Sequence, residues 1–283
     1  MKDRAYAKIN LCLDIAGRRD DGYHELKMIM VPLDFYDVLE MIPATETSLA
    51  LNRSFLPVNE KNTVIKAIRV MQERYQIPGG FACSLTKHIP TRAGLAGGSA
   101  DAAAAIRLID RMLSLHMSTD EMIDIARQVG SDVPFCVVNK PALVEGTGEK
   151  IYPFSCNADF DILLVKPQKG VSTKDAFELA DHTECPHPDC DAMREALITG
   201  NYEKMVASLG NSLEPAAIQL VREIRTVRNR LTEAGFDGVL MSGSGSTVFA
   251  VTKNEELLEE TMKQMRRERY FVRRTRILNG GRI

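Results

Sequence analysis

A glycine-rich loop that leads into a helix constrains this chain more than any other stretch of its sequence. Residues 90–103 read PTRAGLAGGSADAA, and Gly94, Gly97 and Gly98 leave a backbone almost free of side-chain bulk. The apolar residues of segment 102–115 then recur at helical spacing. Backbone N–H groups of such a loop can surround an anion, and the helix dipole adds about half a positive charge. The stretch predicts a phosphate site; the alternative is a tight turn into a closely packed alanine-rich helix.

This loop differs from the two commonest phosphate-binding loops. A Walker A loop places Lys and then Ser or Thr after its last glycine, whereas Ser99 and Ala100 follow Gly98 here. A dinucleotide fingerprint needs G-x-G-x-x-G directly after a strand, with an acidic residue about 20 residues further on. The chain meets neither requirement, so we expect a third kind of phosphate site.

The composition excludes several classes of protein. The chain has 283 residues, 45% apolar and 26% charged, which is typical of a globular protein long enough for two domains. A net charge of −2 gives no general attraction to nucleic acid or anionic membranes. No apolar run approaches the roughly 18 residues of a membrane-spanning helix, and no signal-peptide core follows the N-terminus. We therefore expect neither a nucleic-acid nor a membrane partner.

The six cysteines are scattered, mostly through apolar segments. This pattern predicts reduced, buried thiols in a cytoplasmic protein, not a disulfide framework. His182, Cys185, His187 and Cys190 crowd together, and their spacing suggests a zinc site. Because prolines interrupt the group and no second pair lies at a matching distance, we expect no metal site there.

Two polar side chains share one face of the first predicted strand, residues 5–15. Lys8 and Asn10 lie opposite an apolar face, because alternate residues of a strand point the same way. The residues alone leave two interpretations open, a solvated strand face or a pair presented to a ligand. The dipeptide Asp21-Gly22 then predicts a hairpin turn, which brings Tyr23 and His24 just past it, close to the strand of Lys8.

Further along, caps and apolar stripes predict helices on both sides of the loop. Asn62 begins one helix, and the strand 81–89 leads directly into the loop with Lys87 at its mouth. Ser118 begins another helix as part of a capping box. Asp132 follows in a short turn, where it either caps the next turn or serves as a general base near phosphate.

The C-terminal half predicts an α+β layer after a polar joint at residues 154–161. A short helix contains Phe177, and a long amphipathic helix runs from about Ala216 to Gly235. Strands and one more helix follow, with a second loop of small residues at 242–246. The arginines of segment 266–276 are interpreted as a solvated face.

Three segments taken together, 5–15, 90–103 and 241–250, resemble the signature motifs of the GHMP small-molecule kinases. Segments 18–26 and 169–173, with VGSDVPF after Gln128, narrow the resemblance to the branch that serves non-mevalonate isoprenoid synthesis. The resemblance implies an α+β fold of two domains, residues 1–155 and residues 156–283. The first is expected to be like the second domain of ribosomal protein S5 and the second ferredoxin-like, with the active site in the cleft between them.

The resemblance also implies a reaction and assigns residues to it. The γ-phosphoryl group of ATP, with Mg²⁺, is transferred to the 2-hydroxyl of a cytidine diphosphate-linked methylerythritol. Asp132 is implied as general base and Lys8 as its partner, which suits a tertiary alcohol that must lose its proton. The residues implied for ATP are Pro90, Gly94, Leu95, Ala96, Gly97, Gly98, Ser99, Asn62 and Lys87. Those implied for the acceptor are Asn10, Tyr23, His24 and Phe177.

Three residues depart from the family pattern. Tyr6 stands where Pro is usual, Ala100 where a second Ser is common, and Ser246 where Pro is frequent. None of these removes a proposed catalytic group, although Ala100 leaves Ser99 as the only hydroxyl at the end of the loop. A GHMP-type kinase for another alcohol (mevalonate, homoserine or a sugar) is the alternative, and a non-catalytic nucleotide- or RNA-binding protein is a third. The enzyme is expected to be a monomer or a homodimer.

Overall fold

A computed structural model describes residues 1–278, in which the chain forms two compact units that interleave along the sequence. The first unit comprises Met1–Ala7, Phe35–Pro90 and Ala96–Asn139. The second comprises Lys8–Asp34, Thr91–Leu95 and the described residues from Lys140 onward. The first two strands each contribute residues to both units. The predicted domain boundary between residues 155 and 156 divides the chain only once and stays a prediction.

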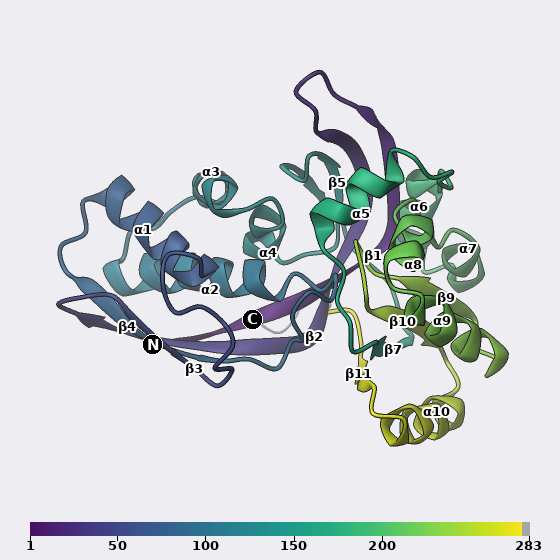
Figure 1. Cartoon of the computed structure of the whole chain (residues 1–283). Coiled ribbons are helices and arrows are strands. Elements are labelled where there is room, and N and C mark those ends of the chain that lie inside the picture. Colours follow the sequence, from purple (N-terminus) through teal and green to yellow (C-terminus); the bar gives the residue numbers. More distant parts are fainter. Residues whose placement is uncertain (279–283) are drawn as a thin grey trace. The chain divides into compact units, whose positions relative to one another are not determined.

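Helices and strands follow one another through most of the described chain (Figure 1). The strands are β1 (Lys2–Arg18), β2 (His24–Ala44), β3 (Ser48–Leu51), β4 (Gly80–Thr86), β5 (Ala142–Gly146), β6 (Lys150–Pro153), β7 (Asp161–Lys166), β8 (Gly210–Asn211), β9 (Gly238–Met241), β10 (Val248–Thr252) and β11 (Phe271–Thr275). The helices are α1 (Thr63–Tyr75), α2 (Gly97–Leu113), α3 (Thr119–Val129), α4 (Val133–Val138), α5 (Thr173–Ala180), α6 (Cys190–Thr199), α7 (Tyr202–Ala207), α8 (Glu214–Leu220), α9 (Glu223–Glu233) and α10 (Glu255–Arg267).

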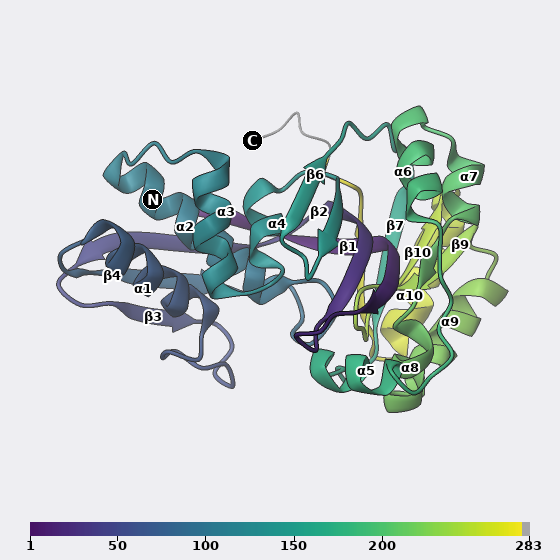
Figure 2. The same ribbon diagram turned by 90° about the horizontal axis from the view of Figure 1, so that it is seen from above.

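In the first unit, helices cover a small sheet. The second half of β2 pairs antiparallel with β4, Val38 opposite Thr86, and β3 pairs parallel with β4. Figures 1 and 2 show α1, α2 and α3 together on one face of β3 and β4. Helices α1, α3 and α4 all contact α2, whose alanines and isoleucines are all buried. Small side chains on α2 let its neighbours approach closely, so this helix forms the centre of the unit.

The second unit contains a four-stranded antiparallel sheet in the order β11-β7-β10-β9. Numbered by their place in the chain, these strands have the order 4-1-3-2. Helix α9 packs against β9 and β10, and α10 packs against β11 and β7. All six residues of β7 and all five of β10 are buried. In this unit, the second half of β1 pairs with β8, and the first half of β2 pairs with β5.

Local signals explain where many elements begin. Asn62 Oδ1 accepts a hydrogen bond from the N–H of Val64, and Ser118 Oγ accepts one from Glu121, so both predicted caps are confirmed. The turn at Gly22, with φ of +85°, joins β1 to β2 as the hairpin signal predicted. None of the described helices is long and apolar enough to cross a membrane.

Four details of the sequence prediction were wrong. Helix α2 begins at Gly97, five residues earlier than predicted. The long helix predicted from Ala216 is two helices, because the backbone at Val221 leaves the helical conformation and exposes Leu220. Cys12 and Cys190 form a disulfide, so not all six thiols are reduced. In the basic run, Arg274 and Arg276 bind the carboxylate of Asp161 instead of facing only water.

Candidate active site

The N-terminus of α2 presents uncapped backbone N–H groups. Ala96 holds the N-cap position with φ of +54° and has no side chain that can cap the helix. Gly97, Gly98 and Ser99 form the first turn. Within residues 1–278 the half-buried Ser99 hydroxyl makes no hydrogen bond. A 17-residue helix with an open first turn is the arrangement that binds phosphate.

The preceding residues of the loop pack directly on the segment that joins β9 to β10. A Cβ atom on Gly94 would lie 2.0 Å from the carbonyl oxygen of Ser242, and φ at Gly94 is +72°. The Ser242 hydroxyl donates to the Gly94 carbonyl at 3.0 Å, and the Thr247 N–H donates to the Ala93 carbonyl at 3.2 Å. Both the space and the backbone conformation therefore require glycine at position 94.

A third segment, residues 169–170 after β7, contacts both the loop and the β9–β10 connection. A Cβ atom on Gly170 would lie 2.4 Å from the Cβ of Arg92, so the turn after β7 also lies against the loop. The Ser246 hydroxyl donates to the Lys169 carbonyl at 2.6 Å. Three connections that are far apart in sequence thus contact one another through backbone and short side chains, which fixes the backbone of segment 91–95.

Lys8 and Asn10 of β1 are buried, with exposed fractions of 4% and 1%. The Lys8 ammonium donates to Asn10 Oδ1 at 2.7 Å, and the Lys8 N–H donates to the Leu95 carbonyl at 3.2 Å. A Cβ atom on Gly243 would lie within 3.4 Å of both polar groups. Of the two interpretations of this strand face, burial excludes the solvated one. The lysine charge lies beside the glycine-containing segments.

Asn211 of β8, which belongs to none of the sequence motifs, orients the segment beside Lys8. Its amide nitrogen donates to the carbonyls of Met241 and Gly243, each at 2.8 Å, and its Oδ1 accepts from the N–H of Leu213. Asn211 is 1% exposed, so these bonds form away from water. Asn211 thus binds the backbone on both sides of Ser242, at Met241 and at Gly243.

Asp132 occupies the N-cap position of α4, yet its side chain makes no capping hydrogen bond. This excludes the alternative in which the Asp132 side chain serves only to cap the helix. Asp132 belongs to the first unit and Lys8 to the second. The pairing of these two residues stays a prediction.

Lys87 lies in a buried group with two carboxylates. Its ammonium donates to Asp101 Oδ2 at 2.5 Å and to Asp37 Oδ2. Burial opposes the lysine charge, but Asp101 and Asp37 more than offset it, so the pKa of Lys87 is raised. A Cβ atom on Gly97 would lie 3.3 Å from Lys87 Nζ, so this group lies directly beneath the start of α2.

The two carboxylates of this group differ in their hydrogen bonds. Asp37 also accepts from the backbone N–H groups of His88 and Ile89, whereas Asp101 Oδ1 is buried without a partner. Burial raises the pKa of Asp101 to about 8, Lys87 opposes this shift, and Asp37 adds to it. Burial thus favours the neutral form of Asp101, whereas the ammonium of Lys87 favours its carboxylate.

The remaining residues predicted for ATP lie around the same helix end. The side-chain amide of Asn62 is bonded within the protein: its oxygen accepts from the N–H of Val64, and its nitrogen donates to the Pro57 carbonyl. The adjacent Thr63 donates its hydroxyl to the Gly98 carbonyl at 2.7 Å, which ties α1 to α2. Pro90 is half-buried at the entry to the loop. Their contacts with a nucleotide stay predictions.

Two of the three predicted nucleobase residues contact each other. The rings of His24 and Phe177 stack with centroids 5.0 Å apart and an angle of 25° between their planes. His24 Nε2 lies 2.7 Å from Asp181 Oδ1. Tyr23 is 65% exposed at the hairpin, and within residues 1–278 its ring makes no aromatic contact. The structure thus brings His24 and Phe177 together and leaves Tyr23 apart from them.

Two of the four residues considered for a zinc site, His187 and Cys190, contact other residues of the protein. No group of three or more His, Cys, Asp or Glu residues within the described chain is placed to hold a metal ion. Cys190 bonds to Cys12, and His187 Nδ1 lies 2.8 Å from Asp14 Oδ1.

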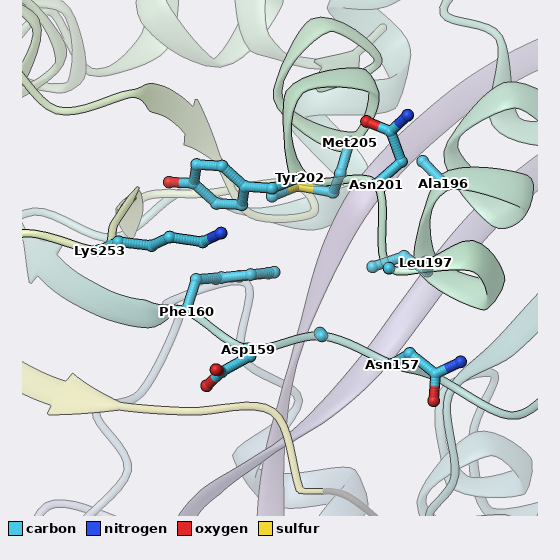
Figure 3. A pocket seen from close by; sticks show the side chains of 11 residues that line it. Asn157, Asp159, Phe160, Ala196, Leu197, Asn201, Tyr202, Met205 and Lys253 are labelled. Atoms are coloured by element: carbon cyan, nitrogen blue, oxygen red, sulfur yellow. The ribbon is translucent and has the colours of Figure 1, made fainter.

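A pocket elsewhere in the second unit contains none of the predicted site residues (Figure 3). Lys253 lies over the Tyr202 ring, 4.5 Å from its centroid, and Phe160 lies beside that ring. The Tyr202 hydroxyl donates to Asp237 Oδ2 at 2.6 Å. The Asn157 amide donates to the Ile198 carbonyl, and Asn201 Oδ1 accepts from the N–H of Lys204.

Comparison with known families agrees with this geometry. Residues 62–140 match the family described as GHMP kinases N terminal domain, and residues 193–270 match GHMP kinases C terminal. The chain belongs to the GHMP kinases. In this GHMP kinase, the first match covers α1 to α4 and the second runs from within α6 to the end of α10, so both domains of the fold are present.

Curated relatives of this GHMP kinase share most of its length. The 4-diphosphocytidyl-2-C-methyl-D-erythritol kinase of Clostridium beijerinckii is 39% identical over 279 residues, which cover 96% of this chain and 99% of the relative. The protein of the same name from Bacillus velezensis is 38% identical over 266 residues, covering 93% and 92%.

Solved structures agree in fold. A crystal structure of 4-(cytidine 5'-diphospho)-2C-methyl-D-erythritol kinase has a TM-score of 0.81 and 30% identity, covering 99% of this chain and 100% of that chain. The mevalonate kinase of L. major, in complex with R-mevalonate, has a TM-score of 0.73 at 16% identity, covering 100% and 97%. The second likeness concerns the fold alone. The α+β, two-domain GHMP kinase fold predicted from the sequence is confirmed.

Proposed function

We propose that this GHMP kinase transfers the γ-phosphoryl group of ATP to the 2-hydroxyl of 4-diphosphocytidyl-2-C-methyl-D-erythritol. The reaction belongs to the methylerythritol phosphate route to isoprenoid precursors, and we place it in the cytoplasm. The observation that carries the proposal is the 39% identity, over 96% of the chain, to a kinase of that name. The hairpin with Tyr23 and His24, and the stack of His24 on Phe177, support a nucleobase in the acceptor.

Asp132 acts as general base in this proposal. A tertiary alcohol is a weak nucleophile, and a carboxylate within hydrogen-bond reach takes its proton as the new P–O bond forms. The buried ammonium of Lys8, oriented by Asn10, stabilises negative charge on the hydroxyl and phosphoryl oxygens.

The loop and the first turn of α2 hold the ATP phosphates. Phosphoryl transfer depends mainly on positioning and on charge stabilisation, which uncapped N–H groups supply. The donor set suits Mg²⁺ that arrives with ATP, since such ions keep several waters and need few protein ligands. The Ser99 hydroxyl, which makes no hydrogen bond within residues 1–278, would be its protein ligand. Bound there, Mg²⁺ would neutralise part of the phosphate charge.

Tyr23, His24 and Phe177 bind the cytidine end of the acceptor, and Asn10 contacts the erythritol part. Aromatic rings stack on a planar base, whereas mevalonate, homoserine and sugars offer no such face. The acceptor is therefore selected by the hairpin and α5, and the donor by the loop.

The test is transfer of labelled phosphate from [γ-³²P]ATP to a panel of alcohols. We expect labelled product from 4-diphosphocytidyl-2-C-methyl-D-erythritol, and none from mevalonate or homoserine at equal concentration. Cytidine 5'-monophosphate should inhibit competitively against the acceptor. Labelling of mevalonate or homoserine in preference would replace the proposed acceptor, and ATP binding without transfer to any alcohol would contradict an enzymatic role.

A further inference from the structure

Asp181, immediately after α5, contacts the hairpin that carries the predicted base-binding histidine. Its Oδ1 lies 2.7 Å from His24 Nε2, and its Oδ2 lies 3.4 Å from the guanidinium of Arg18. The side chains of His24 and Asp181 are 12% and 23% exposed. This contact joins residues 157 positions apart, and neither the motifs nor the predicted site included Asp181.

The contact determines which ring nitrogen of His24 carries the proton. The hydrogen bond from His24 lowers the pKa of Asp181, burial opposes this, and the charge of Arg18 lowers it further. Asp181 is thus ionised at neutral pH and can only accept, so Nε2 must be the donor. In a neutral imidazole Nδ1 is then an acceptor, and within residues 1–278 it makes no hydrogen bond.

The ring plane of His24 is fixed as well. Its stack on Phe177, with centroids 5.0 Å apart, prevents the ring from turning without loss of that contact. Phe177 lies on α5, one helical turn before Asp181. The end of α5 therefore sets both the orientation and the tautomer of His24, while the hairpin supplies the ring.

We propose that Asp181 is a positioning residue that makes the kinase prefer cytosine to uracil. The inference rests on the proposed function, in which His24 contacts the edge of the base. Cytosine carries an amino group at position 4, which donates to an acceptor such as Nδ1. Uracil carries a carbonyl oxygen there, so Nδ1 and that oxygen face each other as two acceptors and one hydrogen bond is lost.

Without the carboxylate, the imidazole can exchange tautomers and donate from Nδ1 to the uracil carbonyl. Asp181→Asn keeps the shape of the side chain, but an amide can donate or accept and no longer dictates the tautomer. The preference for cytosine should therefore fall even where the fold and the stack on Phe177 are unchanged.

Binding of cytidine and uridine 5'-monophosphates, measured by calorimetry at about pH 8, above the ordinary pKa range of histidine side chains in general, tests the inference. We expect the wild-type protein to bind the cytidine nucleotide about tenfold more tightly or better, as one lost hydrogen bond implies. In Asp181→Asn the ratio should fall to about threefold or less. Glu178→Gln, which removes an exposed carboxylate of α5 that pairs with Lys174, should keep the wild-type ratio.

A second measurement reads the tautomer without any nucleotide. The ¹⁵N chemical shifts of His24 in the wild-type protein should report a protonated Nε2 and a bare Nδ1, and in Asp181→Asn a mixture of both forms. An unchanged tautomer and an unchanged nucleotide ratio in Asp181→Asn would overturn the inference while leaving the proposed function intact. Failure of the wild-type protein to bind the cytidine nucleotide would overturn both.

Discussion

The ammonium of Lys8 donates a 2.7 Å hydrogen bond to Oδ1 of Asn10 on the same buried face of β1. A buried charge needs partners, since desolvation disfavours it. The strand therefore holds a charged lysine in one orientation beside Gly243. The hydrogen bond thus explains why Asn10 accompanies Lys8 on this face of the strand.

Asn10→Ala removes an acceptor from this ammonium. We expect kcat to fall by about 10²-fold, because a displaced catalytic group loses its alignment, and stability to fall by about 1–3 kcal/mol. Steady-state kinetics and urea unfolding measure the two effects. Asn157→Ala, in the pocket of Figure 3, removes an amide that donates to the Ile198 carbonyl and should leave kcat unchanged. Equal kcat in Asn10→Ala and wild type would refute a role for the pair in catalysis.

Gly94→Ala places a Cβ atom 2.0 Å from the Ser242 carbonyl oxygen at a φ of +72°. Because both atoms belong to backbone segments, relief requires the loop to move, and we expect a loss of about 3 kcal/mol or more in stability. ATP binding should weaken with it. Gly17→Ala is the matched control, since a Cβ there meets nothing within 4 Å. Unfolding midpoints and ATP titrations of the two variants should differ sharply, and similar values would contradict the close approach.

Asp101 makes stability depend on pH. Burial raises its pKa from 3.8 to about 8, so the folded protein keeps a proton that the unfolded chain has lost. The contribution of Asp101 to the free energy of unfolding is therefore greatest below about pH 4, and it declines as the pH rises towards about 8. Asp101→Asn removes this titration. Urea unfolding between about pH 5 and pH 8 should show a flatter dependence in the variant, and parallel curves would show that Asp101 does not hold the proton.

The Cys12–Cys190 disulfide joins β1 to the start of α6. Protein purified without reductant and then denatured should show four reactive thiols, and six after reduction. Reduction should lower stability by about 2–4 kcal/mol. Cys190→Ser should remove this effect of reductant, whereas Cys185→Ser should retain it. Six reactive thiols before reduction would exclude the bridge.

Local elements were predictable where a single residue fixes the backbone, as Asn62, Ser118 and Gly22 do. The start of α2 was not, because glycines are poor helix formers and the contact from Thr63 to Gly98 lies outside the window of any local pattern. The break at Val221 was hidden for a similar reason, since the apolar stripe continues through the exposed Leu220.

Within the site, the motif resemblance predicted the residues that form the loop, but not the residues whose hydrogen bonds fix the neighbouring groups in place. Asn211 reaches Gly243 across 32 residues, and Asp37 reaches Lys87 across 50. The pairing of Cys12 with Cys190, 178 residues apart, is of the same kind, because spacing does not determine connectivity. Such contacts form only when the chain folds, and no local pattern of the sequence predicts them.

The most direct measurement is ADP release from ATP that depends on 4-diphosphocytidyl-2-C-methyl-D-erythritol, in wild type and in Asp132→Asn. We expect rapid release in wild type and a fall in kcat of about 10²- to 10⁴-fold in the variant, the usual loss when a general base is removed. Asp124→Asn, an exposed carboxylate of α3 that pairs with Arg127, should behave as wild type. No release by wild type, or full activity in Asp132→Asn, would contradict the account.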